Sequence, residues 1–287
     1  NNVNYGTYRF WHRLGASRVV SGRELTLKEI RELRENIPEE LEIESFVHGA
    51  MCISYSGRCL LSAYMTGRDA NLGACTHPCR WKYYLMEEKR PGEYFPVEEN
   101  ERGTYIFNSK DLCLIEYIPE LVDAGVTSFK IEGRVKSEYY VANTVKAYRH
   151  EIDRYYENPD KYVFDPRQLE ELQKVSHRVY STGFWHGAPK DEGQVYDNNA
   201  YIRDYEVVGV VKECDDEGNA IVMQKNKFSV GDTVEIMQPV NDTIEFKVTS
   251  IINDKGNEIE SATVGKMLLK VKLPQKVDVN SMLRKQN

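Results

Sequence analysis

Apolar residues follow two different spacings along the first 160 residues of the chain. A helical spacing, with apolar side chains three or four positions apart, predicts helices over 5–14, 26–36, 109–125 and 137–156. Alternating or short continuous apolar runs predict strands over 17–20, 41–47, 104–107 and 126–131. Thr26 and Glu29 have the spacing of a capping box, which supports the start of the second helix.

Helices and strands that alternate with short loops are typical of a parallel sheet or a (β/α) barrel. Four strands are predicted before residue 135, whereas a closed TIM-like barrel has eight. The chain starts at Asn1 without an initiating Met. We therefore expect residues 1–160 to be the C-terminal part of a TIM-like (β/α) barrel whose N-terminal half is missing.

The pattern changes after residue 160. Residues 161–204 are expected to be a connecting region, with a helix over 166–176 followed by a Gly-, Asp- and Asn-rich linker. From residue 205 the apolar runs become short and turn residues separate them. Strands predicted over 207–211, 220–225, 233–237, 244–252 and 266–271 indicate a small antiparallel β-barrel domain over 205–287.

Composition narrows the setting of this α/β chain. It has 287 residues, of which 29% are charged, and a formal net charge of −7. No run approaches the 18 to 20 apolar residues of a membrane span, so we expect no membrane association and a cytoplasmic location. RNA-binding proteins tend to be basic, so the net charge gives no support to that class, although a local basic face can still bind phosphate.

Four of the six cysteines lie within 28 residues, with the spacing C-x6-C-x15-C-x3-C. In a long, charged chain, four such thiols favour a metal site over disulfides or unrelated buried thiols. Zinc and an iron–sulfur cluster both remain open from the spacing, which favours the cluster slightly. The expected ligands are Cys52, Cys59, Cys75 and Cys79, while Cys113, in a predicted helix, and Cys214 are expected to be ordinary fold residues.

Polar and charged residues stand where the predicted strands end, which is where parallel α/β folds place their chemistry. Arg23, Lys110 and Arg134 are candidates for binding a small dicarboxylate, because guanidinium groups match carboxylates. His48, four residues before Cys52, and Glu132 are candidate catalytic groups. Each of these residues is equally typical of a helix-entry ion pair, a solvated turn or a structural histidine.

Several blocks of the sequence resemble the peptidase U32 family. The first runs from Glu44 through Gly49-Ala-Met-Cys52 to Cys59-x-Leu61-Ser62. Asn108-Ser-Lys-Asp-Leu112, Lys130-Ile-Glu-Gly-Arg134 and Lys225-Asn-Lys-Phe-Ser-Val-Gly-Asp232 follow in the family's order. The similarity is greatest to the subgroup that forms 5-hydroxyuridine at the wobble position of tRNA.

This resemblance implies a TIM-barrel-like domain followed by a small β-barrel. It implies a [4Fe–4S] cluster on Cys52, Cys59, Cys75 and Cys79. Some relatives take the fourth ligand from further downstream, where Cys113 is the nearby alternative in this chain. It also implies tRNA as a partner, and prephenate, a dicarboxylate that Arg23 and Arg134 would bind. A partner protein is a further expectation.

Three functions compete at this point. The family name implies a collagenase-like peptidase, but the sequence has no H-E-x-x-H zinc site and no G-x-S-x-G elbow. A cluster-bearing accessory to an oxygenation system is a non-enzymatic alternative. A tRNA hydroxylase would account for the cysteines, for the basic residues at the strand ends and for the aromatic and basic residues that follow Cys79. It is therefore the function that we expect.

Overall fold

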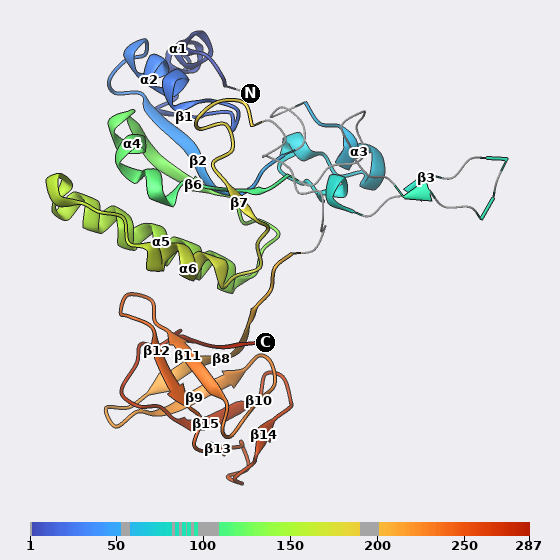
Figure 1. Ribbon diagram of the computed structural model, residues 1–287, viewed down its shortest axis with the longest axis vertical. Coiled ribbons are helices and arrows are strands. Elements are labelled where there is room, and N and C mark those ends of the chain that lie inside the picture. Colours follow the sequence, from blue (N-terminus) through green and yellow to red (C-terminus); the bar gives the residue numbers. More distant parts are fainter. Residues whose placement is uncertain are drawn as a thin grey trace. The chain divides into compact units, whose positions relative to one another are not determined.

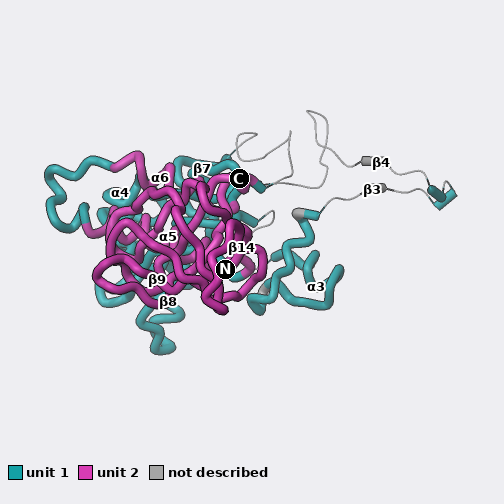
Figure 2. The backbone as a smooth tube through the Cα atoms, turned by 90° about the horizontal axis from the view of Figure 1, so that it is seen from below, with its two compact units in different colours: residues 1–134, 154–164, 177–201 teal, residues 135–153, 165–176, 202–287 magenta. Residues whose placement is uncertain are grey.

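The computed structural model describes residues 2–52, 58–81, 84–85, 88–89, 91–92, 95–96, 109–189 and 201–287. The chain divides into two compact units that interleave along the sequence. Unit 1 contains residues 1–134, 154–164 and 177–201, and unit 2 contains residues 135–153, 165–176 and 202–287, as the two colours in Figure 2 show. Each unit has its own sheet.

Unit 1 is a mixed α/β unit (Figure 1). Its sheet elements are β1 (Arg18–Val20), β2 (Glu42–Ala50), β5 (Asp111–Cys113), β6 (Val126–Ile131) and β7 (Tyr180–Ser181). Its helices are α1 (Tyr5–Arg13), α2 (Leu27–Glu35) and α4 (Ile118–Asp123), with 3-10 turns η3 (Ile115–Tyr117) and η4 (Pro159–Lys161). These bounds confirm most of the helices and strands predicted before residue 135.

Strand β2 is the centre of this sheet. Its first part lies between β1 and β6 and runs parallel to both, with Val19 opposite Ile43 and Phe46 opposite Lys130. Its last three residues pair with β5 in the antiparallel direction, and β5 pairs with β7 in parallel. Ile43 and Val47 are buried, which explains why a half-apolar sequence forms a central strand.

The helix predicted over 109–125 is wrong in its first half. Residues Asp111–Cys113 form strand β5, and a helix begins only at Ile118. Most residues from Leu112 to Ile118 are buried. Their apolar side chains therefore do not mark one face of the segment, and the spacing of these side chains does not distinguish a helix from a strand. Cys113 therefore lies in a strand opposite His48, and not in a helix. The strand predicted over 104–107 lies outside the described residues.

The cysteine segment follows β2. Its described elements are α3 (Leu61–Thr66), η1 (Ala70–Leu72), η2 (Pro78–Arg80) and the paired strands β3 (Tyr84–Leu85) and β4 (Phe95–Pro96). The buried hydroxyl of Ser62 accepts a hydrogen bond from the backbone N–H of Thr76 at 3.1 Å. Thr66 and Thr76 lie 3.1 Å apart through their side-chain oxygens. These bonds fix helix α3 against the loop that carries Cys75 and Cys79.

Unit 2 is built on a seven-stranded antiparallel sheet with the order β12-β11-β16-β8-β9-β15-β13. The strands are β8 (Tyr205–Cys214), β9 (Asn219–Gln224), β11 (Thr233–Met237), β12 (Ile244–Lys247), β13 (Ile251–Ile252), β15 (Leu268–Lys272) and β16 (Met282–Gln286). A small second sheet pairs β10 (Phe228–Ser229) with β14 (Ser261–Ala262). Alternate residues along β9 and β15 point into a core that includes Val222, Phe228 and Leu269.

The antiparallel architecture predicted for residues 205–287 is present, but the sheet is a curled half-barrel. Strands β12 and β13 stand at its two edges and do not pair with each other, although all of residues 201–287 are described. The main part of α5 (Glu138–Glu157) and α6 (Pro166–Gln173) also belong to unit 2. No helix in the described part of the chain combines the length and apolar character needed to cross a bilayer.

Candidate functional site

The carboxyl ends of three neighbouring strands of unit 1 meet at one edge of its sheet. Strands β1, β2 and β6 are parallel neighbours, so the residues that follow them share this edge. Arg23 follows β1, Cys52 follows β2, and Glu132 and Arg134 follow β6. The structure thus brings together four of the residues that the sequence suggested as functional.

Glu132 is the acceptor at the centre of this group. Its Oε1 accepts hydrogen bonds from the backbone N–H of Arg134 at 3.1 Å and from Nε of the same residue at 3.2 Å. Its Oε2 lies 3.4 Å from Nη2 of Arg23. Burial by itself would raise the pKa of Glu132, but the bonds and charges of the two arginines hold it below its ordinary value. Glu132 is therefore a carboxylate in this site.

Arg23 is a largely buried cation whose side chain is 16% exposed. Its guanidinium carbon lies 3.8 Å from the centre of the Phe46 ring, which covers one face. Burial lowers the pKa of Arg23, and the opposing charges of Glu132 and of a Cys52 thiolate do not restore it. Glu132, Cys52 and Glu24 all act to raise the pKa of Arg23, while the nearby charge of Arg134 lowers it, so the site holds both signs of charge.

Arg134 links the strand end to the cysteine segment. Its Nη1 donates a hydrogen bond to the backbone carbonyl of Gly73, two residues before Cys75. About half of the Arg134 side chain, 51%, stays exposed, so the guanidinium keeps a surface for a ligand. The group Arg23, Glu132 and Arg134 is called the arginine–glutamate site below.

The cysteines have the chemistry that an iron–sulfur cluster requires. None of the four predicted ligands is in a disulfide, and none of them is fully buried. The Sγ of Cys75 accepts a hydrogen bond from the backbone N–H of His77 at 3.3 Å, an interaction that stabilises a thiolate. Cys113, the alternative fourth ligand, is buried in β5, whereas Cys79 lies in η2, in the same loop as Cys75. Four thiols of one segment therefore fit the cluster that the sequence suggests.

A different group is the tightest set of metal-type side chains among the described residues. The ligand atoms of His150, Glu151 and Asp165, in unit 2, lie within 4.8 Å of one another. Asp165 already caps helix α6 and pairs with Arg167 at 2.6 Å, so this group has a structural explanation. The four cysteines do not form such a group among the described residues.

His48 lies in a second polar group of unit 1 that the sequence did not reveal. His48 is buried in β2 with its ring 5.2 Å from that of Tyr180, and Tyr180 stacks on His177 at 4.7 Å. Asp111 accepts a hydrogen bond from the backbone N–H of Arg178 at 3.1 Å. The sequence does contain the adjacent polar residues His177 and Arg178, but it does not indicate which residues they contact.

Lys110 is placed only through its backbone. It precedes Asp111, which pairs with Ala50, so Lys110 lies near the end of β2 that leads to Cys52. Its predicted role in binding a carboxylate stays a prediction. Asp111 itself is a buried strand residue.

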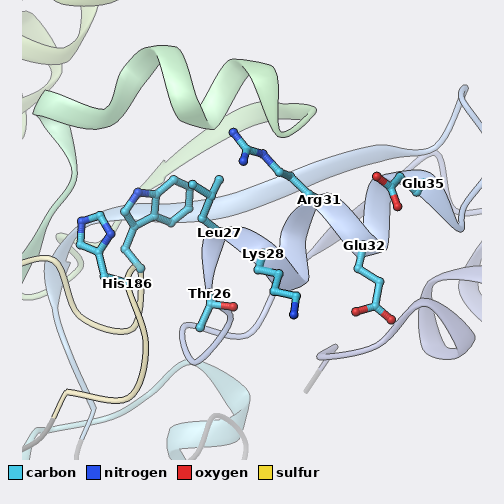
Figure 3. Close-up of a pocket in the computed structure, with 8 residues that line it drawn as sticks. Thr26, Leu27, Lys28, Arg31, Glu32, Glu35 and His186 are labelled. Carbon is cyan, nitrogen blue, oxygen red and sulfur yellow. The ribbon is translucent and has the colours of Figure 1, made fainter.

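A pocket of about 650 Å³ begins three residues after Arg23, at the start of α2 (Figure 3). Leu27 and Trp185 are joined across it by a backbone hydrogen bond of 3.1 Å. Exposed Lys28, Arg31 and His186 line it, while Glu32 and Glu35 stand toward the end opposite His186. The lining carries both signs of charge, with Lys28 and Arg31 beside Glu32 and Glu35, and His186 is its exposed aromatic ring.

Comparison with known proteins gives two matches that together cover nearly the whole chain. Residues 1–195 match the model of peptidase family U32, and residues 203–284 match the model of the peptidase family U32 C-terminal domain. The chain belongs to peptidase family U32. The U32 resemblance of the sequence blocks is thereby confirmed.

Individual U32 relatives have different names. The chain is 40% identical over 283 residues to tRNA hydroxylation protein P1 of Bacillus subtilis, covering 98% of the chain and 66% of the relative. It is 38% identical to tRNA hydroxylation protein P of Escherichia coli, covering 100% of the chain and 71% of the relative. A collagenase of Porphyromonas gingivalis is 33% identical over 65% of the chain and 45% of its own length. The chain thus spans about two thirds of the length of the Bacillus subtilis relative.

Proposed function

We propose that this U32 chain is part of a tRNA hydroxylase that forms 5-hydroxyuridine at the wobble position. The observation that carries the proposal is the similarity of 40% and 38% to proteins named for tRNA hydroxylation, over 98% and 100% of the chain. The similarity to a collagenase covers less of the chain at lower identity. Hydroxylation is therefore preferred over proteolysis.

The arginine–glutamate site is the proposed binding site for a dicarboxylate co-substrate, with prephenate as the specific proposal. The Arg23 side chain keeps an exposed fraction of 16% and that of Arg134 one of 51%, so one carboxylate can meet each of them. Glu132 keeps both arginines in place as an ionised acceptor. We propose Lys110 as a further positive group near the same strand end.

Cys52, Cys59, Cys75 and Cys79 are the proposed ligands of a [4Fe–4S] cluster, with Cys113 as the alternative to Cys79. When bound, such a cluster would supply electron transfer next to the co-substrate. The guanidinium groups of Arg23 and Arg134 at the same strand end favour an anionic ligand beside Cys52.

His48 and Glu132 are proposed to serve the reaction in different ways. A buried histidine next to Tyr180 can hold or pass a proton within the site. Glu132 stays ionised between two arginines, which suits a group that orients ligands better than one that donates protons.

The pocket at α2 is the proposed contact for tRNA. Lys28 and Arg31 can reach phosphate oxygens, and His186 can stack against a base. Such a local basic face is compatible with the net charge of −7.

For the fold, we propose that unit 1 is the C-terminal part of a TIM-like barrel and that the protein works in the cytoplasm.

The decisive experiment compares tRNA from cells with and without the gene. We expect 5-hydroxyuridine nucleosides, measured by mass spectrometry, to disappear with the gene and to return with the wild-type gene but not with Cys52→Ala or Cys75→Ala. Unchanged 5-hydroxyuridine in the deletion strain would contradict the proposal. An assay with the purified protein distinguishes a hydroxylase from a cluster-bearing accessory. A hydroxylase must modify tRNA without a partner protein, whereas an accessory cannot.

The cluster has its own test. Anaerobically purified full-length protein is expected to be brown, to contain iron and sulfide, and to lose both on Cys52→Ala. Stoichiometric zinc without iron under these conditions would contradict the [4Fe–4S] assignment and favour the zinc alternative.

A further inference from the structure

The turn Glu132-Gly133-Arg134 touches the chain just before the first and the third cysteine of the cysteine segment. Its first residue packs on Gly49, three residues before Cys52, and its last residue binds Gly73, two residues before Cys75. Both glycines have a positive φ, of 107° and 79°. One short turn thus contacts the chain at two places, one just before Cys52 and one just before Cys75.

The contact at Gly49 is close because no side chain separates the two backbones. A Cβ built on Gly49 would overlap the carbonyl oxygen of Glu132 and would lie 3.0 Å from its Cβ. The backbone N–H of Glu132 also donates to the carbonyl of His48 at 2.9 Å. The start of the turn is thereby fixed against the end of β2, from which Cys52 follows.

The contact at Gly73 is made by a side chain that is itself held. Arg134 donates to Glu132 through its backbone N–H and its Nε, which fixes the plane of the guanidinium. Its Nη1 then reaches the carbonyl of Gly73, and a Cβ on Gly73 would lie 2.7 Å from this nitrogen. Only glycine leaves room for this approach at this backbone angle.

We propose that Glu132 and Arg134 are positioning residues for the cysteine centre, and that they set the separation between Cys52 and Cys75. The inference rests on the proposed function in that the cysteines hold a metal centre. Arg134 acts through a fork of donors that bonds two acceptors at once, and a lysine, with a single nitrogen, cannot reproduce this geometry. The role is therefore one of geometry and not of charge alone.

The test measures metal retention rather than activity. Full-length protein and its variants are purified anaerobically, and their iron content and visible absorbance are followed after addition of an iron chelator. We expect Gly73→Ala and Arg134→Lys to release iron about tenfold faster than wild type, or more, because groups that orient metal ligands commonly contribute 10- to 100-fold to metal retention. Far-ultraviolet circular dichroism establishes that each variant is folded.

Gly67→Ala is the matched control. Gly67 lies in the same segment and has a positive φ of 68°, but a Cβ there would meet nothing within 4 Å. This variant carries the same kind of backbone strain without touching Arg134, so we expect wild-type iron release. Release as fast as in Gly73→Ala would mean that strain in the loop, and not the contact with Arg134, holds the metal.

A double variant separates the contact from independent effects. If Gly73 and Arg134 act through each other, Gly73→Ala combined with Arg134→Lys releases iron no faster than the faster single variant. Multiplied effects, or iron retention by Arg134→Lys equal to wild type, would overturn the inference. Wild-type protein that contains no iron would instead overturn the proposed cluster, so the two failures are distinguishable.

Discussion

Each unit of this protein has an arginine that pairs with carboxylates, Arg23 in unit 1 and Arg284 in unit 2, and the two differ in burial. In unit 2, Arg284 is 0% exposed and bonds Glu171 at 2.5 Å and Glu235 at 2.7 Å. Tyr139 and Asn143 accept further bonds from it at 3.1 and 2.9 Å. With Lys174 also bound to both glutamates, two positive charges meet two negative charges.

The pKa values of the two arginines shift in opposite directions. Burial lowers the pKa of Arg23 and its partners do not reverse this. Burial alone would also lower the pKa of Arg284, but Tyr139, Glu171 and Glu235 raise it above its ordinary value. Arg284, which is fully buried between carboxylates, is a structural element, whereas the Arg23 side chain keeps an exposed fraction of 16%.

The largest expected effect is on Arg284. Arg284→Met leaves Glu171 and Glu235 in a buried site with only Lys174, so we expect the free energy of unfolding to fall by about 3–5 kcal/mol. Urea titration followed by circular dichroism measures it. The control is Lys276→Met, which removes an ion pair with Asp216 on the surface and is expected to change nothing measurable. Equal results for both variants would remove the distinction between buried and surface charge.

Arg23→Met is expected to affect binding more than folding. Glu132 keeps its bonds to Arg134 in this variant, but a carboxylate ligand loses one charged partner. The affinity for prephenate, measured by calorimetry, should fall about 10- to 100-fold. Arg18→Met, at the opposite end of β1, serves as the control. Unchanged affinity in Arg23→Met would place the co-substrate elsewhere.

The acid limb of stability should depend on the Arg284 group. Arg284 and Lys174 overcome the effect of burial and hold the pKa of Glu171 below its ordinary value of 4.5. A lowered folded-state pKa contributes stability that is present above that ordinary value and is lost as the pH falls through the folded-state pKa. Urea titrations from about pH 6 to about pH 3 should show this loss in wild type, and a weaker one in Arg284→Met. An identical pH dependence would exclude the pairing as its cause.

The smallest expected effect concerns the hydroxyl of Tyr139. Burial raises the pKa of Tyr139 to about 12, so the group stays neutral and accepts from Arg284. Tyr139→Phe removes one of the five side chains that accept from Arg284, and we expect a loss of about 1 kcal/mol in the free energy of unfolding. Tyr156→Phe, on the exposed side of α5, should be neutral. A loss as large as that of Arg284→Met would mean that the hydroxyl, and not the carboxylates, compensates the arginine.

The elements that could be predicted are those with one buried and one exposed face. Helices α1 and α2 and the first half of strand β2 have such faces, and their bounds followed from the sequence to within a few residues. Strand β5 has three buried residues in a row and gave no periodic signal. Strand β16 was missed because Arg284 and Lys285 make it look like a surface segment.

The site could be predicted in part for the same reason. Arg23, Glu132 and Arg134 follow strands that the sequence reveals, so their convergence followed from parallel topology. Arg178 was missed because its bond to Asp111 joins residues 67 positions apart. Arg284 likewise depends on Glu171, 113 positions away. No local pattern encodes such pairs.

The shared use of Arg134 couples two events. The same guanidinium holds the loop of Cys75 and, in the proposed function, one carboxylate of the co-substrate. A bound anion can weaken or strengthen the bond between Arg134 and Gly73. By thermodynamic linkage, the same free energy appears as a change in anion affinity when the metal centre is loaded. In the proposed function, co-substrate binding and metal binding therefore affect each other through the Arg134 side chain, without movement of a domain.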